Sequence, residues 1–272
     1  MSVKLSVSVV AYHNHPAQIA GVLDSVARGG LPIDCWLIDN SRTATLADVA
    51  HRFHARYLHL PHNPGYGAAH NVAIEAGIEA RGAYHAVINP DVRFSSDVLP
   101  EMVAFMERHP DVGLLAPRVQ YPDGSPQHLC KLLPHPIDLL LRRFCPPLHR
   151  LGGRLARYEL RGAGYDRVRD VPVLSGCFML LRLAMVRQVG AFDPGYFMYF
   201  EDVDLSRRIG TVARTMYFPH ATITHEYARG SYRNLHLMRC HARSAVRYFN
   251  KWGWWRDARR DAVNRAAAAD VN

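Results

Sequence analysis

The feature that most constrains the fold is a regular alternation of short apolar runs with segments of helical periodicity from residue 5 to residue 116. The apolar runs lie at residues 5–10, 35–38, 57–60, 86–88 and 114–116, and the segments between them repeat apolar residues at helical spacing. Strands that alternate with helices in this way build βαβ units, whose strands run parallel and whose helices cover both faces of the sheet. We therefore expect an α/β fold around a mostly parallel central sheet. A composition of 49% hydrophobic and 21% charged residues excludes a disordered or collagen-like chain.

Polar residues follow three of these runs at the point where each expected strand ends. The three clusters are Tyr12–Asn14, Asp39–Asn40 and Asn89–Asp91. The carboxyl ends of parallel strands meet at one edge of a sheet, and ligands bind there. A carboxylate such as Asp91 can hold Mg²⁺ or Mn²⁺ in a diphosphate complex, because hard cations prefer oxygen ligands. The loop 63–67 can offer backbone N–H groups to a phosphate at the start of a helix. Each feature alone is explained equally well by ordinary turn residues, so the predicted site depends on their combination.

A later segment, residues 192–205, places four carboxylates among aromatic side chains. The acids are Asp193, Glu201, Asp202 and Asp204. Aromatic surfaces are common platforms for sugar rings, and a carboxylate beside one is a candidate general base. Packing alone does not account for four acids in this setting, so we interpret the segment as part of a site for sugar chemistry.

The motifs, taken in order, resemble those of the family 2 inverting glycosyltransferases with the GT-A fold, and most closely those of the bacterial rhamnosyltransferase-like members. The resemblance extends from about residue 5 to residue 250. It rests on the segments 6–10, 37–41, 63–71, 89–92, 121–125, 174–179 and 190–205, followed by His225 and Ser231. It implies a GT-A fold with a Rossmann-like sheet, a C-terminal helical segment, and Mg²⁺ or Mn²⁺ as cofactor.

The resemblance also implies a role for each matching residue. Asp202 would be the catalytic base, and Glu201 would orient Asp202 or the acceptor. Asp91 and His225 would contact the metal and the diphosphate, and Gly176 would leave room for the acceptor sugar. The nucleotide-sugar contacts would come from Tyr12, Asn14, Asp39, Asn40, Asn63, Gly65, Gly67, Asn71, Asn89 and Asp91, with Asp39 recognising the base. The usual metal motif of the family is Asp-x-Asp. Here Asn89 replaces the first acid, as in the rhamnosyltransferase-like subgroup, and it contributes no charge to a metal.

The function implied is transfer of a sugar, L-rhamnose by resemblance, from a nucleoside diphosphate to a glycan or lipid-linked glycan, with inversion, in bacterial surface polysaccharide synthesis. A family 2 enzyme that uses a uridine-diphospho-sugar is the first alternative. A more distant alternative is a non-catalytic nucleic-acid-binding protein, given a sequence pI of about 9.5. No nucleic-acid-binding motif is present, and the acids at 201–204 repel phosphates, so we expect no nucleic acid as partner. A dinucleotide-binding oxidoreductase is disfavoured, because the glycine motif at 65–70 lacks its third glycine and does not follow the first strand.

The net charge of +9 is concentrated in two segments. Residues 140–169 contain eight arginines against two acids, and residues 229–260 contain eight arginines and Lys251 against Asp257. Such an asymmetry favours a polyanionic partner, although a solvated surface is an equal alternative for the first segment. We expect residues 1–228 to form the catalytic domain, with a loop or lid excursion at 129–171, and residues 229–272 to form a basic amphipathic helical tail.

The tail combines a basic stripe with tryptophans, which is typical of helices that lie in lipid headgroups. The stripe consists of Arg239, Arg243, Arg247 and Lys251, and the tryptophans are Trp252, Trp254 and Trp255. The alternative is a helix packed on the domain with a solvated basic side. No apolar run is long enough to span a membrane and no signal peptide is evident. We therefore expect a cytoplasmic protein that lies peripherally on the inner face of the plasma membrane. The five cysteines, an odd number without a CxxC pair, indicate free thiols.

Overall fold

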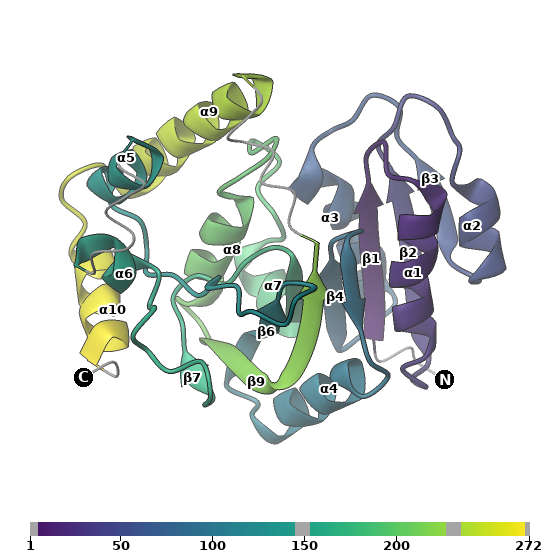
Figure 1. The fold of residues 1–272 in the computed structure, drawn as a ribbon, viewed down its shortest axis with the longest axis horizontal. Helices are drawn as coiled ribbons and strands as arrows, with labels where there is room; N and C mark the ends of the chain where they lie inside the picture. Colours follow the sequence, from purple (N-terminus) through teal and green to yellow (C-terminus); the bar gives the residue numbers. More distant parts are fainter. Residues whose placement is uncertain (1–4, 145–152, 227–234, 270–272) are drawn as a thin grey trace.

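The computed structural model describes residues 5–144, 153–226 and 235–269, and these residues surround one nine-stranded sheet (Figure 1). The strands are β1 (Leu5–Ala11), β2 (Ile33–Asp39), β3 (Arg56–His59), β4 (Tyr84–Ile88), β5 (Val92–Phe94), β6 (Val112–Gln120), β7 (Arg169–Asp170), β8 (Phe178–Arg182) and β9 (Arg214–His225). Their order is β3-β2-β1-β4-β8-β6-β9-β5, and β7 pairs with β9 outside this path. The α/β architecture expected from the alternation is confirmed.

The first half of the sheet is parallel and the second half is mixed. β3, β2, β1 and β4 pair in parallel, as the βαβ spacing predicts. β8 then runs antiparallel to both β4 and β6, while β6 and β9 are parallel. β5 and β7 pair antiparallel with β9. The sheet is thus more mixed than expected, because the strands that follow residue 117 do not continue the βαβ alternation.

Helices cover both faces of the sheet, and each face has its own hydrophobic core. One face is covered by α1 (Pro16–Ala27), α2 (Ala47–Arg52) and α4 (Val98–Arg108), and the other by α3 (Tyr66–Glu79), α7 (Leu183–Val189) and α8 (Glu201–Ile209). Successive strand side chains point to opposite faces. In β8, Phe178 and Leu180 enter the first core, whereas Met179 and Leu181 enter the second.

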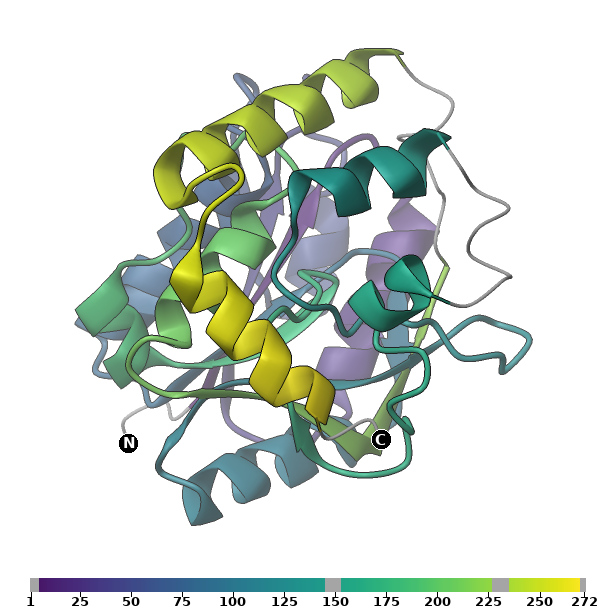
Figure 2. The same ribbon diagram turned by 90° about the vertical axis from the view of Figure 1, so that its left-hand side faces the viewer.

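The excursion after β6 is helical and packs against the C-terminal helices. It contains α5 (Pro136–Phe144) and α6 (Arg154–Tyr158), and the C-terminal part contains α9 (Leu235–Trp252) and α10 (Ala258–Ala269). Figures 1 and 2 both show α5 and α9 side by side at one end of the molecule. The side chain of Asn264 in α10 exchanges two hydrogen bonds with the backbone of Leu133, at 2.8 and 2.9 Å.

α9 is fastened to the segment before α8 by an aromatic cluster. Tyr196, Phe200, Tyr248 and Phe249 are all buried there.

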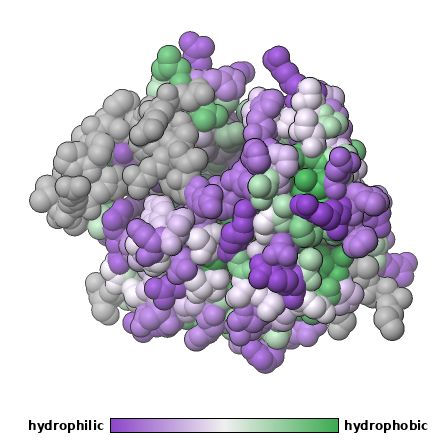
Figure 3. Space-filling model, turned by 45° about the vertical axis from the view of Figure 1, so that its right-hand side comes forward, coloured by the Kyte–Doolittle hydropathy of each residue, from purple (hydrophilic) through white to green (hydrophobic). Residues whose placement is uncertain are grey.

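On the face in Figure 3, hydrophilic residues cover most of the surface and hydrophobic residues emerge in separate areas. In the described part of the chain, no helix combines the length and apolarity that a membrane crossing requires.

Candidate active site

The polar clusters predicted at the strand ends are neighbours at one edge of the sheet. After β2, the Asn40 N–H donates to the carbonyl of Ala11 at 2.8 Å. The His13 N–H donates to Ser41 Oγ at 2.8 Å, and Asn40 Nδ2 donates to Asn63 Oδ1 at 3.2 Å. The parallel register of β1 and β2, which pairs Ala11 with Asp39, makes these contacts possible. The first two clusters and the loop 63–67 therefore form one surface.

Asp39 is buried beneath this surface, and its carboxylate holds the loop that follows β2 by hydrogen bonds. Its Oδ1 accepts a hydrogen bond from the Ser41 N–H at 2.9 Å, and its Oδ2 accepts one from the Tyr57 hydroxyl at 2.8 Å. Burial, and then the hydrogen bond to Asp39, raise the pKa of Tyr57. Because Asp39 is 0% exposed, it presents no surface atom to a nucleotide base in this conformation. The expected base contact stays a prediction.

Tyr12 and Asn14 differ in what they present to a ligand. The Tyr12 side chain is 54% exposed beside the Asp39 loop, so it is available to stack on a base. The Asn14 amide is used internally, since Oδ1 accepts from the Tyr12 N–H at 2.8 Å and Nδ2 donates to Gln18 at 2.8 Å. Asn14 therefore orders the loop that carries Tyr12.

Gly65 is required by a close approach between two loops. Its φ is +100°, which L residues rarely adopt, and a Cβ there would collide with the Phe197 carbonyl oxygen. The Tyr66 N–H donates to the same carbonyl at 2.9 Å. The loop 63–67 therefore packs directly against the aromatic segment that precedes α8.

Asn71 is turned into the protein, and its expected contact with the nucleotide sugar is corrected accordingly. Its Nδ2 donates to the Phe192 carbonyl at 2.7 Å, and its Oδ1 accepts from the Phe192 N–H at 3.0 Å. Gly67 has a similar packing role, because a Cβ there would lie 2.8 Å from Phe192 Cβ. Both residues hold α3 against the segment at 192.

Tyr66 connects the two halves of the site, and the sequence motif alone does not single it out. Its hydroxyl lies 2.8 Å from Asn89 Oδ1 and 2.7 Å from the Gly176 carbonyl oxygen. The Asn89 N–H in turn donates to the Cys177 carbonyl at 2.9 Å. A tyrosine between two glycines carries no chemical signature in a sequence, so only the fold reveals this position.

Asp202 contacts the turn formed by Gly176 and Cys177 through the Gly176 N–H, and Asp91 lies near the same turn. Burial raises the pKa of the Cys177 thiol to about 12, and the charges of Asp91 and Asp202 add to this shift. Burial also raises the pKa of Tyr66, with the charges of both acids contributing. The charges of both carboxylates therefore reach Tyr66 and Cys177.

Asp91 and His225 meet because β5 and β9 pair directly beside them. Val92 is opposite His225 in the antiparallel ladder, and the Glu226 N–H donates to the Asp91 carbonyl at 3.1 Å. His225 Nε2 lies 3.3 Å from Asp91 Oδ1. That oxygen is buried and has no hydrogen-bond partner. A buried carboxylate oxygen without a donor, facing an imidazole nitrogen, fits a divalent cation held by one oxygen and one nitrogen ligand.

The described residues contain no group of three or more histidine, cysteine or acidic side chains that could hold a metal ion by itself. Asp91 and His225 thus supply two ligand atoms, and Asn89 places its side-chain oxygen against Tyr66 instead. Diphosphate oxygens and water would have to complete the coordination of a cation here, as is common for Mg²⁺.

Glu201 and Asp202 begin α8 immediately after two residues with left-handed backbone. Tyr199 and Phe200 have φ values of +69° and +66°, a strained conformation of the kind found at functional sites. Asp202 Oδ2 accepts a hydrogen bond from the Gly176 N–H at 3.0 Å, which fixes its orientation. A Cβ on Gly176 would lie 3.3 Å from Asp202 Cβ, so a larger residue there would crowd the acid.

The two acids of this pair differ in their surroundings. Glu201 is buried, and its Oε2 has no hydrogen-bond partner. Burial, and then the neighbouring Asp202 charge, raise the pKa of Glu201 well above its ordinary value. A buried setting and a neighbouring carboxylate therefore both favour the protonated form of Glu201.

Lys131 lies near Asp202 and is not identified by the sequence motifs. It forms a bridge with Val173, in which each N–H donates to the other carbonyl at 3.1 Å. Burial, and then the charge of Arg142, lower the pKa of Lys131 to about 8, while the charge of Asp202 opposes the shift. A cation thus lies close to the expected acceptor side of the site.

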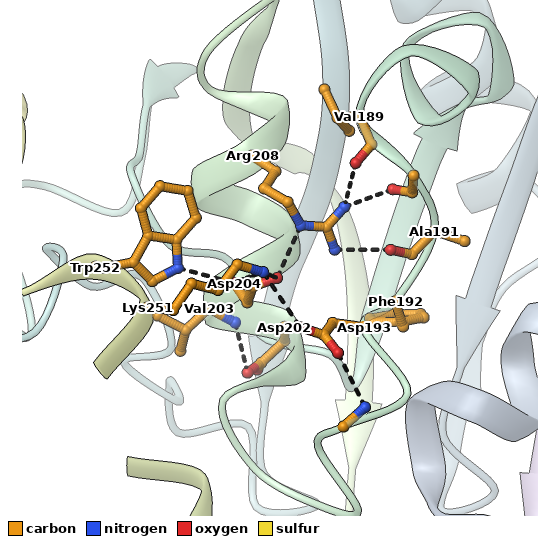
Figure 4. Close-up of polar contacts among 12 residues, drawn as sticks. Val189, Ala191, Phe192, Asp193, Asp202, Val203, Asp204, Arg208, Lys251 and Trp252 are labelled. Carbon is orange, nitrogen blue, oxygen red and sulfur yellow. Dashed lines mark hydrogen bonds and ion pairs between the residues drawn. The ribbon is translucent and has the colours of Figure 1, made fainter. Parts of the chain in front are cut away.

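Two of the four acids at 192–205 serve packing, which corrects the expectation that all four indicate sugar chemistry (Figure 4). Asp204 is fully buried and accepts hydrogen bonds from Arg208 Nε, Lys251 Nζ and Trp252 Nε1, at 2.8, 3.0 and 2.8 Å. Asp193 pairs with Arg247 at 2.9 Å and with Lys251 at 3.2 Å. These contacts join α9 to α8 and to the segment before it, so half of the expected basic stripe, although exposed, forms ion pairs within the protein.

Comparison with known proteins identifies the family. The model of the family described as "Glycosyl transferase family 2" matches residues 6–190. The N-acetylglucosaminyl-diphospho-decaprenol L-rhamnosyltransferase of Mycobacterium tuberculosis is 30% identical over 239 residues, which cover 83% of this chain and 78% of that protein. The chain belongs to glycosyl transferase family 2. A shorter match joins this glycosyltransferase to the rhamnosyltransferase WbbL of Escherichia coli, with 36% identity over 76 residues that cover 27% of this chain and 29% of that protein.

Solved structures support the fold of this family 2 glycosyltransferase. The mannosyltransferase PcManGT from Pyrobaculum calidifontis, solved with GDP-Man and Mn²⁺, is similar with a TM-score of 0.59 and 16% identity. The match covers 91% of this chain and 63% of that one. GalNAc-T7, solved with UDP, GalNAc and Mn²⁺, has a TM-score of 0.63 and 14% identity, over 92% of this chain and 48% of that one. The expected GT-A fold is confirmed.

Proposed function

We propose that this glycosyltransferase transfers L-rhamnose, with inversion, from a nucleoside diphosphate to a lipid-linked N-acetylglucosamine acceptor. Two contacts support the proposal: His225 Nε2 lies 3.3 Å from Asp91 Oδ1, and the Gly176 N–H donates to Asp202 Oδ2 at 3.0 Å. The charges of both acids also raise the pKa of Cys177, so both acids lie near the turn 176–177. The identity to a rhamnosyltransferase over most of the chain supports the choice of sugar and acceptor.

In the proposed reaction, Asp202 accepts the proton of an acceptor hydroxyl as its oxygen attacks the anomeric carbon. The new glycosidic C–O bond forms on the face opposite the nucleotide, and the bond from the anomeric carbon to the diphosphate oxygen breaks. The nucleoside diphosphate leaves with the bonding electron pair, so one displacement inverts the anomeric configuration. The Gly176 N–H holds the Asp202 carboxylate in place for this proton transfer.

Glu201 is the weaker candidate for the base because its raised pKa favours its protonated form. In that form its O–H can donate a hydrogen bond, to Asp202 or to an acceptor hydroxyl, which suits the orienting role expected for it.

Asp91 Oδ1 and His225 Nε2 would hold a Mg²⁺ or Mn²⁺ ion in this proposal. When bound there, the cation would offset the negative charge that the departing diphosphate gains. The Mn²⁺ in two solved proteins of similar fold supports this assignment. Tyr12, Asn40, Asn63 and Asn89 would line the nucleotide-sugar side.

The acceptor side of the site contains the cations that a lipid-linked diphosphate requires. Lys131 lies near Asp202, and Arg142 of α5 lies near Lys131. Arg142 also pairs with Glu159 at 3.5 Å. We propose that Lys131 and Arg142 face the diphosphate of the acceptor. In this arrangement residues 1–228 act as the catalytic domain, and the excursion 129–171 covers the acceptor.

The face formed by α5 and α9 is proposed to rest on an anionic membrane, where such an acceptor resides. Arg239 and Arg243 are exposed on α9. They lie among large apolar side chains that are at least 37% exposed: Ile137, Leu140, Leu235, Met238, Val246, Trp254 and Trp255. This mixture of basic and apolar residues matches a surface of anionic headgroups over acyl chains.

The test is a donor and acceptor panel with the purified chain. Thymidine-diphospho-rhamnose, uridine-diphospho-glucose and uridine-diphospho-N-acetylglucosamine are each incubated with an N-acetylglucosaminyl-diphospho-polyprenol, with Mn²⁺ present. We expect a product heavier by one deoxyhexose, detected by mass spectrometry, with the rhamnose donor only. A product from a uridine donor alone would replace the proposed sugar and support the alternative donor class.

A further inference from the structure

The motif at residues 121–125, which the resemblance includes without a role, forms a tight turn that reverses the chain after β6. The Tyr121 N–H donates to the Ser125 carbonyl at 2.8 Å, and Gly124 has a φ of +82°. Asp123 Oδ1 accepts from the Ser125 N–H at 2.9 Å and from its hydroxyl at 2.6 Å. The turn is therefore fixed by its own side chains.

The reversal places Gln127 beside the end of β9. The Gln127 N–H donates to the Val119 carbonyl at 2.9 Å, which continues the pairing after the turn. Since β6 and β9 are parallel, with Gln120 opposite Thr224, the returning chain lies next to His225. The Gln127 side chain is only 3% exposed.

Gln127 contacts both the backbone and the ring of His225. Its Nε2 donates to the His225 carbonyl at 2.7 Å, and its Oε1 lies 3.0 Å from His225 Nδ1. The first contact distinguishes Nε2 from Oε1 in the Gln127 amide, because only the NH₂ group can donate to a carbonyl. Oε1 can only accept, so Nδ1 must carry the proton in this contact.

A histidine whose Nδ1 is protonated, when neutral, has its lone pair on Nε2. That nitrogen is the atom 3.3 Å from Asp91 Oδ1. We propose that Gln127 is the positioning residue of the Asp91–His225 pair, which fixes the ring and the tautomer of His225 so that a lone pair faces Asp91. The proposal rests on the metal role assigned above to Asp91 and His225.

The energetic effect follows from how ligand residues are supported. A ligating histidine that is free to rotate, or that carries its proton on Nε2, must reorganise before it can bind a cation. Groups that hold the second ring nitrogen of a histidine typically contribute about 10- to 100-fold to metal affinity. Gln127 acts through His225 and need not touch substrate.

The experiment compares Gln127→Leu with Gln127→Glu in the full chain. Leucine cannot accept a hydrogen bond, whereas glutamate keeps an oxygen that can accept from Nδ1. The first readout is the ring ¹⁵N spectrum of His225 in metal-free protein, assigned with a His225→Asn variant. The wild type should show a protonated Nδ1, Gln127→Leu should move the proton toward Nε2, and Gln127→Glu should restore the wild-type pattern.

The second readout is Mn²⁺ affinity in the presence of thymidine diphosphate, followed by electron paramagnetic resonance. Gln127→Leu should weaken Mn²⁺ binding by about 10- to 100-fold, and Gln127→Glu should restore it. Gln120→Leu is the matched control, because Gln120 lies on the same ladder but contacts Thr224 Oγ1, at 3.4 Å. It should leave both readouts unchanged.

The outcomes separate this inference from the proposed function. An unchanged tautomer and an unchanged Mn²⁺ affinity in Gln127→Leu would overturn the positioning role. If Mn²⁺ affinity did not depend on His225 at all, the metal assignment would fail, and the tautomer readout would still decide whether Gln127 orients the ring. Equal losses in Gln127→Leu and Gln120→Leu would show a general disturbance of β6 and would also overturn the proposal.

Discussion

Adjacent acids in one helical turn can have different surroundings, and the pair at the start of α8 illustrates this at the scale of single residues. Glu201 is buried with one carboxyl oxygen unpartnered, whereas Asp202 receives the Gly176 N–H and the Val203 N–H, at 3.0 and 2.8 Å. The difference arises from position in the turn rather than from residue type. It assigns proton acceptance to Asp202 and hydrogen-bond donation to Glu201.

This assignment predicts unequal effects of two isosteric substitutions. Asp202→Asn removes the proton acceptor, so kcat should fall by about 10²- to 10⁴-fold while donor affinity changes little. Glu201→Gln replaces a protonated acid by a group of the same shape, so kcat should fall by less than about 10-fold. Steady-state kinetics and calorimetric titration of the donor would measure both. Comparable losses of kcat in the two variants would contradict the assignment of the base.

At the scale of elements, a few buried polar contacts decide how helices and strands dock. Asp204 lies half a turn beyond Asp202 on α8 and accepts from three donors, two of which belong to α9 (Figure 4). Arg207 reinforces this contact by pairing with Asp257 at 2.6 Å and by stacking on the Trp252 ring at 4.2 Å from its centroid. The helix that carries Asp202 is therefore also the helix on which α9 docks.

Asp204→Asn should destabilise the protein, because it removes the buried counter-charge of Arg208 and one of the two acids that pair with Lys251. Breaking a buried ion pair in this way costs about 3–5 kcal/mol in the free energy of unfolding. Asp261→Asn, which removes an exposed partner of Arg260, should change it by less than about 1 kcal/mol. Urea unfolding monitored by circular dichroism measures both values. Trp252→Phe removes a single hydrogen bond to Asp204 and should cost about 1 kcal/mol if Asp204→Asn proves too unstable to study.

A second buried network joins β1, β4 and α3 beneath the site. Ser6 Oγ and Ser8 Oγ each lie 2.7 Å from a ring nitrogen of His85, and Ser8 Oγ lies 2.6 Å from His70 Nδ1. Burial lowers the pKa of His85 to about 3 and the pKa of His70 well below its ordinary value. Both histidines are therefore neutral in the folded protein over a wide pH range.

This network predicts that stability falls on acidification below about pH 6.5. In that range the unfolded chain binds protons at His85 and the folded protein does not, so the free energy of unfolding decreases by up to about 1.4 kcal/mol per pH unit for each such histidine. His85→Gln should reduce this slope between pH 6 and pH 4, whereas His51→Gln, at an exposed position on α2, should not. Urea unfolding at several pH values gives the slopes. Equal slopes in wild type and His85→Gln would refute the prediction.

At the scale of the whole molecule, charged residues that look alike in the sequence differ in the contacts they make. All four residues of the basic stripe are exposed, and two of them also form ion pairs: Arg247 and Lys251 pair with Asp193, and Lys251 pairs with Asp204. Among the tryptophans, Trp252 is held by Asp204 and Trp255 is 63% exposed. The C-terminal segment therefore packs against the rest of the protein and also exposes basic and aromatic side chains.

Arg239 and Arg243 should contribute to membrane binding, because both are exposed on α9. Arg239→Glu combined with Arg243→Glu should lower binding to vesicles of about 30% phosphatidylserine, since each basic residue near such a surface contributes about 1 kcal/mol. The matched control is Arg52→Glu with Arg108→Glu, at exposed positions on α2 and α4, which Figure 1 shows away from α9. Vesicle sedimentation measures the bound fraction. Equal losses in both double variants would indicate a response to net charge rather than a specific face.

Local patterns predicted the parallel half of the sheet and the clusters at its edge. The reason is that strand alternation and helical periodicity are properties of neighbouring residues, and parallel strands bring their carboxyl ends together whatever lies between them. The residues after β1, β2 and β4 could therefore be assigned to one region by their order in the chain. The inward orientation of Asn71 could not, because its partner is the backbone of Phe192, 121 residues away.

The sequence by itself determined the family, the fold class and the identity of the chemical groups at the site. Tertiary structure decided which of those groups meet: β5 pairs with β9 and thereby brings Asp91 to His225, and the turn after β6 brings Gln127 to the same ring. It also decided that Asp193 and Asp204 hold α9 in place, which their presence in the acidic segment 192–205 does not reveal. Contacts between distant segments depend on sheet pairing and helix docking, and no local periodicity encodes these.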